Sequence, residues 1–587
     1  MKLCYSFAAG LLVAATMGAG CGAKSGGHPL PEPPKVAACE PGVPGGRLVL
    51  SVLGNPRTFN PVLAVDNPSD AVARLLFSSL VTVNMETQEA EPGLAESWSV
   101  APDQKTWTFK LRKNLRWSDG QPLTADDVVF TWNEVMYNPR YNRLTYDLFR
   151  GDGKNFEVTN VDDLTVKVVT PEIFAPFLEY FGSVAILPRH ILGAAVASGR
   201  FLEAYAVTNN PRTIVGSGPF RLKEFDSQRM VVLERNPEYW EVDKKGQRLP
   251  YFDEVQLDLT TSPIELESLF FNGKSAAFET IKPEQAWAFQ QAAANGKFRL
   301  IDLGVGVQRD FFWFNQNTGS DKHGKPFVDP VKSKWFRDRR FREAISCAIN
   351  RARIVKDVYN GHAQPVYAFL SADNKKWNNP GIANYSYNPQ KARALFTELG
   401  MTNRAGDGRM VDAGGHPVEF TMVSSSENPI REAIAVRLAD DLKQFGIVMH
   451  YDAEPFPKML ERINETMDYE SACMGFGGGG LDPASQMNVL MSGAPLHQWF
   501  PSQRTPATDW ERKIDVLMTD QMHTLEFDRR KRDFDEVQAI WANEMPMICI
   551  AAPTTEAGIR KDIGNVRPSI ASAYHVTWNV EELYFKR

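Results

Sequence analysis

Residues 91–132 decide the fold, and they read EPGLAESWSVAPDQKTWTFKLRKNLRWSDGQPLTADDVVFTW. Apolar and polar residues alternate through 106–112, which is the pattern of a strand with one buried face. An Asp-Gly pair then turns the chain. Thr124 precedes Asp127 by three positions, the spacing of a capping box at the start of an amphipathic helix. The stretch holds no nucleophile, acid–base pair or metal-ligand cluster, so it predicts scaffold and not catalysis.

The same stretch resembles a family signature in which LAESW is followed by FxLRxxxxWSDGxPLTAxDV. It is the signature of the family 5 extracellular solute-binding proteins, the receptors of oligopeptide-type ABC importers. Further landmarks follow in the family's order: VGSGPF at 215–220, RNPEYW at 235–240, LPYFD at 249–253, and the helix at 336–350. The resemblance therefore extends from about residue 46 to residue 578.

This resemblance implies an α/β protein with the two-lobed periplasmic-binding-protein fold of type II. It further implies the large form of that fold, with an extra insertion subdomain in the N-terminal lobe. We expect lobe I over 47–310, with the insertion at about 81–212. Lobe II is expected over 311–545, and the chain is expected to return to lobe I over 546–587.

The residues of the second half support a mixed α/β lobe on their own. Beta-prone runs alternate with amphipathic helical runs, and this alternation favours a largely parallel sheet covered by helices. The predicted helices are 336–350, 391–400 and 430–446, and the predicted strands are 419–423, 448–451 and 547–551.

Length and composition exclude several classes of protein. At 587 residues the chain is too long for one ordinary domain, and 43% hydrophobic residues exclude general disorder. A net charge of −6 gives no electrostatic reason to expect a nucleic-acid partner. The six cysteines form no CxxC pair, and the nine histidines form no HExxH, so neither a metal site nor a cofactor is expected. Hydrolysis by two acids far apart in the sequence remains the alternative to pure binding.

The N-terminus is typical of an exported lipoprotein. Lys2 is followed by an apolar run at 7–17 that is too short to span a bilayer, and small residues precede Cys21. We expect 1–20 to be a signal peptide, Cys21 to carry the lipid anchor, and 21–46, rich in Pro and Gly, to be a tether. Gly18 departs from the aliphatic residue usual in such sites, so an ordinary secretory peptide with an incidental Cys is the alternative.

A glycine run at 474–483, MGFGGGGLDP, is the most informative local feature for binding. No Lys-Ser/Thr follows, which rejects a phosphate-binding loop. In peptide-binding relatives this loop carries an aspartate that neutralises the peptide's α-ammonium, and matching Phe476 and Asp482 to the family pattern places Gly479 there. Because a buried ammonium needs an anion, either Asp482 or Glu470 replaces that aspartate, or the ligand has no free α-amine at this place. The alternative role of Asp482 is capping before a proline.

The candidate ligand contacts lie in both lobes and combine aromatic, amide and glycine residues. Trp313 and Trp499 offer stacking surfaces, with a place in the core as their alternative, and Asn315 offers either a polar contact or a hinge turn. The candidates are Asn60, Trp313, Asn315, Phe476, Gly478, Gly479, Asp482 and Trp499.

The sequence thus predicts an extracytoplasmic substrate-binding protein of an ABC importer, located in the periplasm or at the cell membrane. It would capture a peptide or peptide-like solute between two hinged lobes and deliver it, as a monomer, to a permease with separate ATPase subunits. The alternatives are a receptor of the same fold for an oligosaccharide, an opine-like compound or a metal chelate, and an exported hydrolase.

Overall fold

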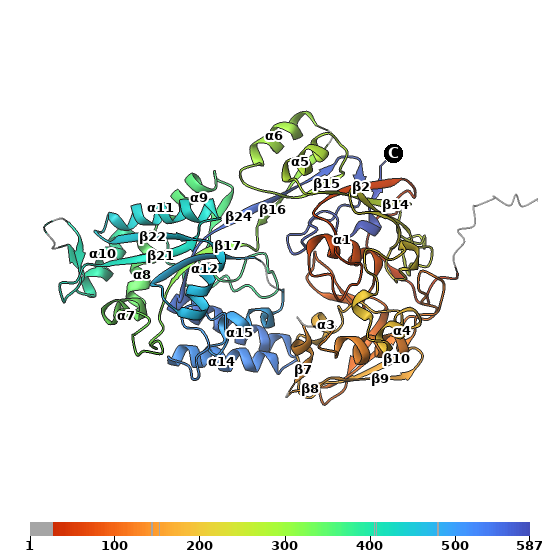
Figure 1. Cartoon of the computed structure of the whole chain (residues 1–587), viewed down its shortest axis with the longest axis horizontal. Helices are drawn as coiled ribbons and strands as arrows, with labels where there is room; N and C mark the ends of the chain where they lie inside the picture. The colour runs from red at the N-terminus through yellow and green to blue at the C-terminus, as the bar shows by residue number, and fades with distance from the viewer. Residues whose placement is uncertain are drawn as a thin grey trace, which may run out of the picture.

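The computed structural model of the protein describes residues 28–142, 145–151, 153–296, 298–403, 406, 408–477 and 480–586. The predicted signal peptide, Cys21, Gly478 and Gly479 lie outside these residues. The described chain forms two bodies joined by long strands (Figure 1). No helix within the described part is long and apolar enough to cross a membrane.

Lobe I is built on a four-stranded sheet in the order β11-β12-β14-β2. Its strands are β2 (Arg47–Leu53), β11 (Phe220–Asp226), β12 (Met230–Arg235) and β14 (Glu254–Thr260). Helix α1 (Asn67–Leu76) buries Val72 and Leu75 in the same core cluster as Leu233 of β12 and Leu257 of β14. The C-terminal residues contribute Ile563, Val576, Val580 and Leu583 to this core.

Residues 91–132 lie in a part of lobe I with a sheet of its own, here called the insertion subdomain. Its antiparallel sheet has the order β5-β6-β10-β9. The strands are β5 (Ala95–Val100), β6 (Thr106–Leu111), β9 (Glu157–Asp162) and β10 (Thr165–Val169), and α2 (Ala125–Phe130) follows β6. The buried Asp127 carboxylate accepts the Thr124 N–H at 3.0 Å, the Trp117 indole at 3.2 Å and the Arg189 N–H at 2.9 Å. One side chain therefore joins the turn, the helix start and helix α4 (Arg189–Ala197).

Lobe II has helices on both faces of its sheet. The strands include β17 (Arg309–Phe314), β21 (Glu419–Ser425), β22 (Val448–Glu454) and β23 (Ser471–Phe476), with β21, β22 and β23 parallel. Helices α8 (Arg339–Ala348) and α11 (Pro429–Lys443) pack on one face, and α14 (Asp509–Met522) and α15 (Phe527–Glu544) on the other (Figure 1). The helix predicted at 336–350 is in fact broken, because Asp338 ends α7 (Pro330–Arg337) and caps α8.

Strand β24 (Met547–Arg560) connects the lobes. Residues 547–551 pair with β17, 551–553 with β18 (Ala363–Pro365) and 554–560 with β16 (Phe298–Val305). Strand β16 leads back to β17 through 306–308, where the Gly306 N–H bonds to the Pro553 carbonyl at 2.8 Å. The chain enters lobe II directly after 306–308, and β24 runs as one strand across the junction (Figure 1).

A small helical layer covers this junction. Helices α5 (Pro263–Phe271) and α6 (Ala286–Asn295) lie over β16, β24 and β15 (Ala277–Ile281) at the top of Figure 1. A separate core holds the layer in place, and its buried members are Phe270, Phe278, Ile281, Phe289 and Phe298. The junction therefore has an apolar core of its own.

The segment at 28–46 differs from the extended tether that its composition predicts. Strand β1 (Lys35–Val36) pairs with β13 (Glu241–Val242), and Ala37 and Cys39 are buried in the core of the insertion subdomain. These small apolar side chains fill space against lobe I, which holds the segment on the surface. The four cysteines of the described part are buried and free of disulfides: Cys39, Cys347, Cys473 and Cys549.

We expect Asp127→Ala to lower the free energy of unfolding by about 2–4 kcal/mol, because three donors lose their buried acceptor. Urea denaturation followed by circular dichroism measures this loss. The neighbouring Asp126 is the matched control: its contacts to Asn160 and Arg189 are exposed, so Asp126→Ala should cost less than about 1 kcal/mol. Equal losses in the two variants would refute the role assigned to Asp127.

Candidate ligand-binding site

A cavity of about 1500 Å³ lies in lobe I, where segments distant in the sequence meet. The lining segments are 34–38, 61–65, 82–85, 140–142, 183–185 and 571–574. Pockets for single small molecules usually measure about 300–1,000 Å³, so this space suits a larger solute. The cavity lies between the central part of lobe I and its insertion subdomain.

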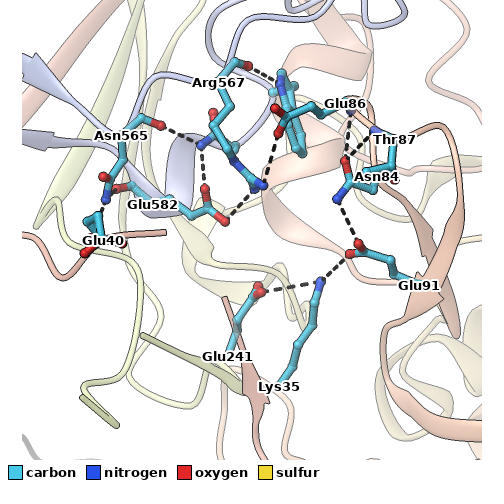
Figure 2. A network of polar contacts seen from close by, with 12 residues as sticks. Lys35, Glu40, Asn84, Glu86, Thr87, Glu91, Glu241, Asn565, Arg567 and Glu582 are labelled. Atoms are coloured by element: carbon cyan, nitrogen blue, oxygen red, sulfur yellow. Dashed lines mark hydrogen bonds and ion pairs between the residues drawn. The ribbon is translucent and has the colours of Figure 1, made fainter. Parts of the chain in front are cut away.

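The cavity wall carries charges of both signs. The basic residues are Lys35, Arg74, Arg112, Arg140 and Arg567, and the acidic residues are Asp70, Glu91, Glu241, Glu581 and Glu582. Figure 2 shows Lys35 between two carboxylates, 3.4 Å from Glu241 and 4.0 Å from Glu91. Polar ligands with both donor and acceptor groups fit such a wall better than apolar ones.

A second group of contacts surrounds Arg567. Its guanidinium lies 2.7 Å from Glu582 and 3.9 Å from Glu86, and it packs on the Trp578 ring (Figure 2). Glu582 also accepts a hydrogen bond from Asn579 at 2.6 Å. These contacts fix the C-terminal segment against the hairpin that contains Glu86, and they satisfy the Glu582 carboxylate within the protein.

Glu581 differs from the other acidic residues of the wall. No opposite charge of the described residues lies within ion-pair distance of its carboxylate, which is favoured only by its own backbone N–H and by the charge of Lys35, whereas Asp70, Glu91, Glu241 and Glu582 each pair with another residue. Burial, together with the charges of Glu241 and Glu582, raises the pKa of Glu581 to about 8. The cavity therefore contains a carboxyl group that a cation would stabilise in its ionised form.

Asn60 lies beside the cavity. It is fully buried, and its side-chain oxygen accepts the Val62 N–H at 3.1 Å, while its amide donates to the Ala204 carbonyl at 3.4 Å. In this structure Asn60 shapes the loop 61–65, which lines the cavity. A direct contact between Asn60 and ligand stays a prediction.

Trp313, Asn315 and Trp499 lie in the interior of lobe II. The Trp313 indole donates to the Tyr469 hydroxyl at 3.1 Å, and the Trp499 indole donates to Glu511 at 3.0 Å. The Asn315 amide donates to two backbone carbonyls. Because each polar group has a protein partner, these side chains serve the core in this conformation, and their predicted contact with ligand stays untested.

The two acids that could replace the missing aspartate at Gly479 are already paired. Both carboxylate oxygens of Asp482 lie 2.8 Å from the buried Arg530 guanidinium, and one also accepts the Ala484 N–H at 2.9 Å, which is the capping role given above as the alternative to ligand contact. Glu470 accepts Lys332 at 2.7 Å and the Thr421 N–H at 2.8 Å. Sequence reasoning could not detect either pairing, because the partners are distant in the chain.

Phe476 is the last residue of β23, directly before the glycine run. Its ring lies 4.7 Å from that of Phe311, so it packs at the end of the lobe II sheet while remaining partly exposed. This position keeps Phe476 available as the predicted aromatic contact.

Lobe II also touches the insertion subdomain, on the side opposite the connecting strands (Figure 1). Gln88 donates to the Asp373 carbonyl at 2.8 Å and accepts the Lys375 N–H at 3.1 Å. A backbone hydrogen bond of 2.9 Å joins Ala175 to Met522. The lobes are thus connected by strands at one side and by a few polar contacts at the other.

This arrangement of lobes, connecting strands and cavity defines a two-lobed solute-binding protein. The sequence matches the family described as bacterial extracellular solute-binding proteins, family 5 Middle, over residues 89–497. The match covers more than half of the chain, and the chain belongs to this family, as the opening stretch predicted.

Related proteins carry names from the same class. A probable ABC transporter-binding protein of Deinococcus radiodurans is 27% identical over 521 residues, covering 85% of each chain. The dipeptide-binding protein of Escherichia coli is 26% identical over 540 residues, covering 88% of this chain and 91% of its own. The substrate-binding protein CtaP of Listeria monocytogenes shares the fold with a TM-score of 0.72 at 22% identity, over 93% of this chain and 100% of its own. The type II fold predicted above is thereby confirmed.

We expect Glu581→Gln to stabilise the protein increasingly as pH rises. Because the pKa of Glu581 is raised from 4.5 to about 8, the folded protein holds a proton that the unfolded chain releases, so stability falls between those pH values. The variant has no titrating group at this position, so it does not lose stability over this pH range. Its Tm should exceed that of the parent at pH 8 and match it near pH 5. Glu40→Gln, at an exposed pair with Lys244, is the control and should show no such trend. A difference that stays constant with pH would contradict the assignment.

Proposed function

We propose that this protein captures a peptide or peptide-like solute outside the cytoplasm and delivers it to an ABC permease. The observation that carries the proposal is the cavity of about 1500 Å³ with charges of both signs on its wall, in a chain of the solute-binding family. Peptides present backbone donors and acceptors together with charged ends, which such a wall can pair. The relatives named for ABC transport and dipeptide binding support the same function.

The proposed mechanism is closure of the lobes around the solute. The two crossings, at 306–308 and within β24, would act as the hinge, and the contacts of Gln88 and Ala175 with lobe II would belong to the closed form. A ligand held at the lobe I cavity would favour that form by also contacting lobe II, which shifts the population without bond chemistry. ATP hydrolysis belongs to partner subunits in this proposal.

A receptor for a non-peptide solute is the second candidate. It is favoured by Gly479, which stands where the resemblance expects an ammonium-binding aspartate, and by the pairing of Asp482 and Glu470 within the protein. An oligosaccharide, an opine-like compound or a metal chelate needs no such aspartate. Glu581 favours the first candidate, because an ammonium group of the solute would stabilise the ionised form of this carboxyl group in lobe I.

The proposal includes export and a lipid anchor at Cys21, with the protein acting as a monomer. It is supported by the short apolar run at 7–17 and by the small residues before Cys21. We expect intact mass spectrometry of detergent-extracted protein to show a chain that begins at residue 21 and carries acyl mass. A chain cleaved elsewhere and free of lipid would overturn the anchor and leave the binding function standing.

We expect native mass spectrometry of the purified protein to reveal a bound peptide, released intact after denaturation. In thermal-shift assays, peptides at 100 times their Kd should stabilise the folded state by about 2.7 kcal/mol. Oligosaccharides and metal chelates serve as the comparison set. Stabilisation by that set alone would establish the second candidate, and recovery of cleaved ligand would indicate a hydrolase.

A further inference from the structure

Buried arginines in this protein are paired, with one exception. Five arginines of the described chain have 9% or less of their surface exposed: Arg112, Arg309, Arg342, Arg351 and Arg530. Burying a guanidinium costs several kcal/mol unless hydrogen bonds or a counter-charge compensate for the lost water. The partners of each arginine therefore indicate whether the protein alone stabilises it.

Four of the five are stabilised by the protein itself. Arg342 and Arg351 each donate at least three hydrogen bonds, mainly to backbone carbonyls. Arg112 donates to the carbonyls of two segments at 2.9 Å and 2.8 Å, and Arg530 contacts both oxygens of Asp482 at 2.8 Å. These arginines have structural roles.

Arg309 has no comparable partner. Its guanidinium makes one long hydrogen bond, 3.4 Å to the Val307 carbonyl, and no carboxylate of the described residues lies within ion-pair distance. The adjacent Asp310 is not available, since it accepts Arg431 at 3.1 Å and the Tyr359 hydroxyl at 2.6 Å. Burial lowers the pKa of Arg309, which agrees with a cation that lacks a counter-charge.

Arg309 lies where the two lobes join. It is the first residue of β17, directly after the crossing at 306–308. In the sheet it lies opposite Phe476, which immediately precedes the glycine run of 477–480. Arg309 therefore lies at the end of the lobe II sheet where the crossing enters β17 and where β23 ends.

We propose that Arg309 binds a carboxylate of the solute. A guanidinium matches a carboxylate with two parallel hydrogen bonds, and these charge-assisted bonds are strong where water is excluded. The family pattern expects an anion at Gly479, shortly after β23 in the sequence, whereas this chain provides a cation on β17, the strand paired with β23. Where the family pattern would bind the amine of a peptide, this end of lobe II would bind the carboxylate of a peptide-like solute.

This inference rests on the proposed function, and a comparison of peptide acids with peptide amides tests it. Tripeptide libraries, prepared as free acids and as C-terminal amides, are titrated by calorimetry into the full-length protein, Arg309→Met and Arg309→Lys. We expect the parent and Arg309→Lys to bind acids at least about tenfold more tightly than amides, and Arg309→Met to bind both equally. Arg437→Met, at a surface pair with Asp357, is the control and should keep the preference.

The outcomes separate the two proposals. Equal binding of acids and amides by the parent, or a preference retained in Arg309→Met, overturns the role of Arg309 and leaves peptide binding intact. No binding of either library overturns peptide binding and this inference together. The ligand-free Tm gives a second measurement: a ligand-binding Arg309 predicts that Arg309→Met is at least as stable as the parent, whereas a structural role predicts a clear decrease.

Discussion

The backbone pairing of β24 is the constraint on which the two-lobed structure depends. This strand bonds to β17 and β18 in lobe II and to β16 and β15 at the junction, so one run of hydrogen bonds holds both bodies. A strand cannot shift by one residue without turning its side chains to the wrong face. The register of β24 therefore fixes which strands of the two lobes meet at the junction.

The distribution of charge separates scaffold from site. Asp482, Glu470 and Asp310 are held by cations from other segments, and most of the charges around the lobe I cavity are paired as well. Glu581 and Arg309 differ, since neither has an opposite charge within ion-pair distance among the described residues. A solute with an amine and a carboxylate would provide opposite charges for Glu581 and Arg309. Binding would thus offset the free-energy cost of leaving these two groups unpaired in the free protein.

Local patterns were enough to predict much of the scaffold. The alternation at 106–112 became β6, and the spacing of Thr124 and Asp127 became the start of α2, because both depend on neighbours within a few residues. The ligand contacts were harder to predict. Trp313 and Trp499 read equally well as stacking surfaces or as core, and their burial depends on partners such as Tyr469, far away in the chain.

The sequence by itself determined the family and the two-lobed α/β fold through its resemblance to the family signature. It determined the strand, turn and capped helix of 91–132 through local periodicity and capping. Only the tertiary structure decided which charges remain unpaired. Asp482 meets Arg530 because α15 packs against the loop of Asp482, and Glu581 enters the cavity wall because the C-terminus returns to lobe I. Charge pairing acts over a few ångströms in space, and sequence distance does not record it.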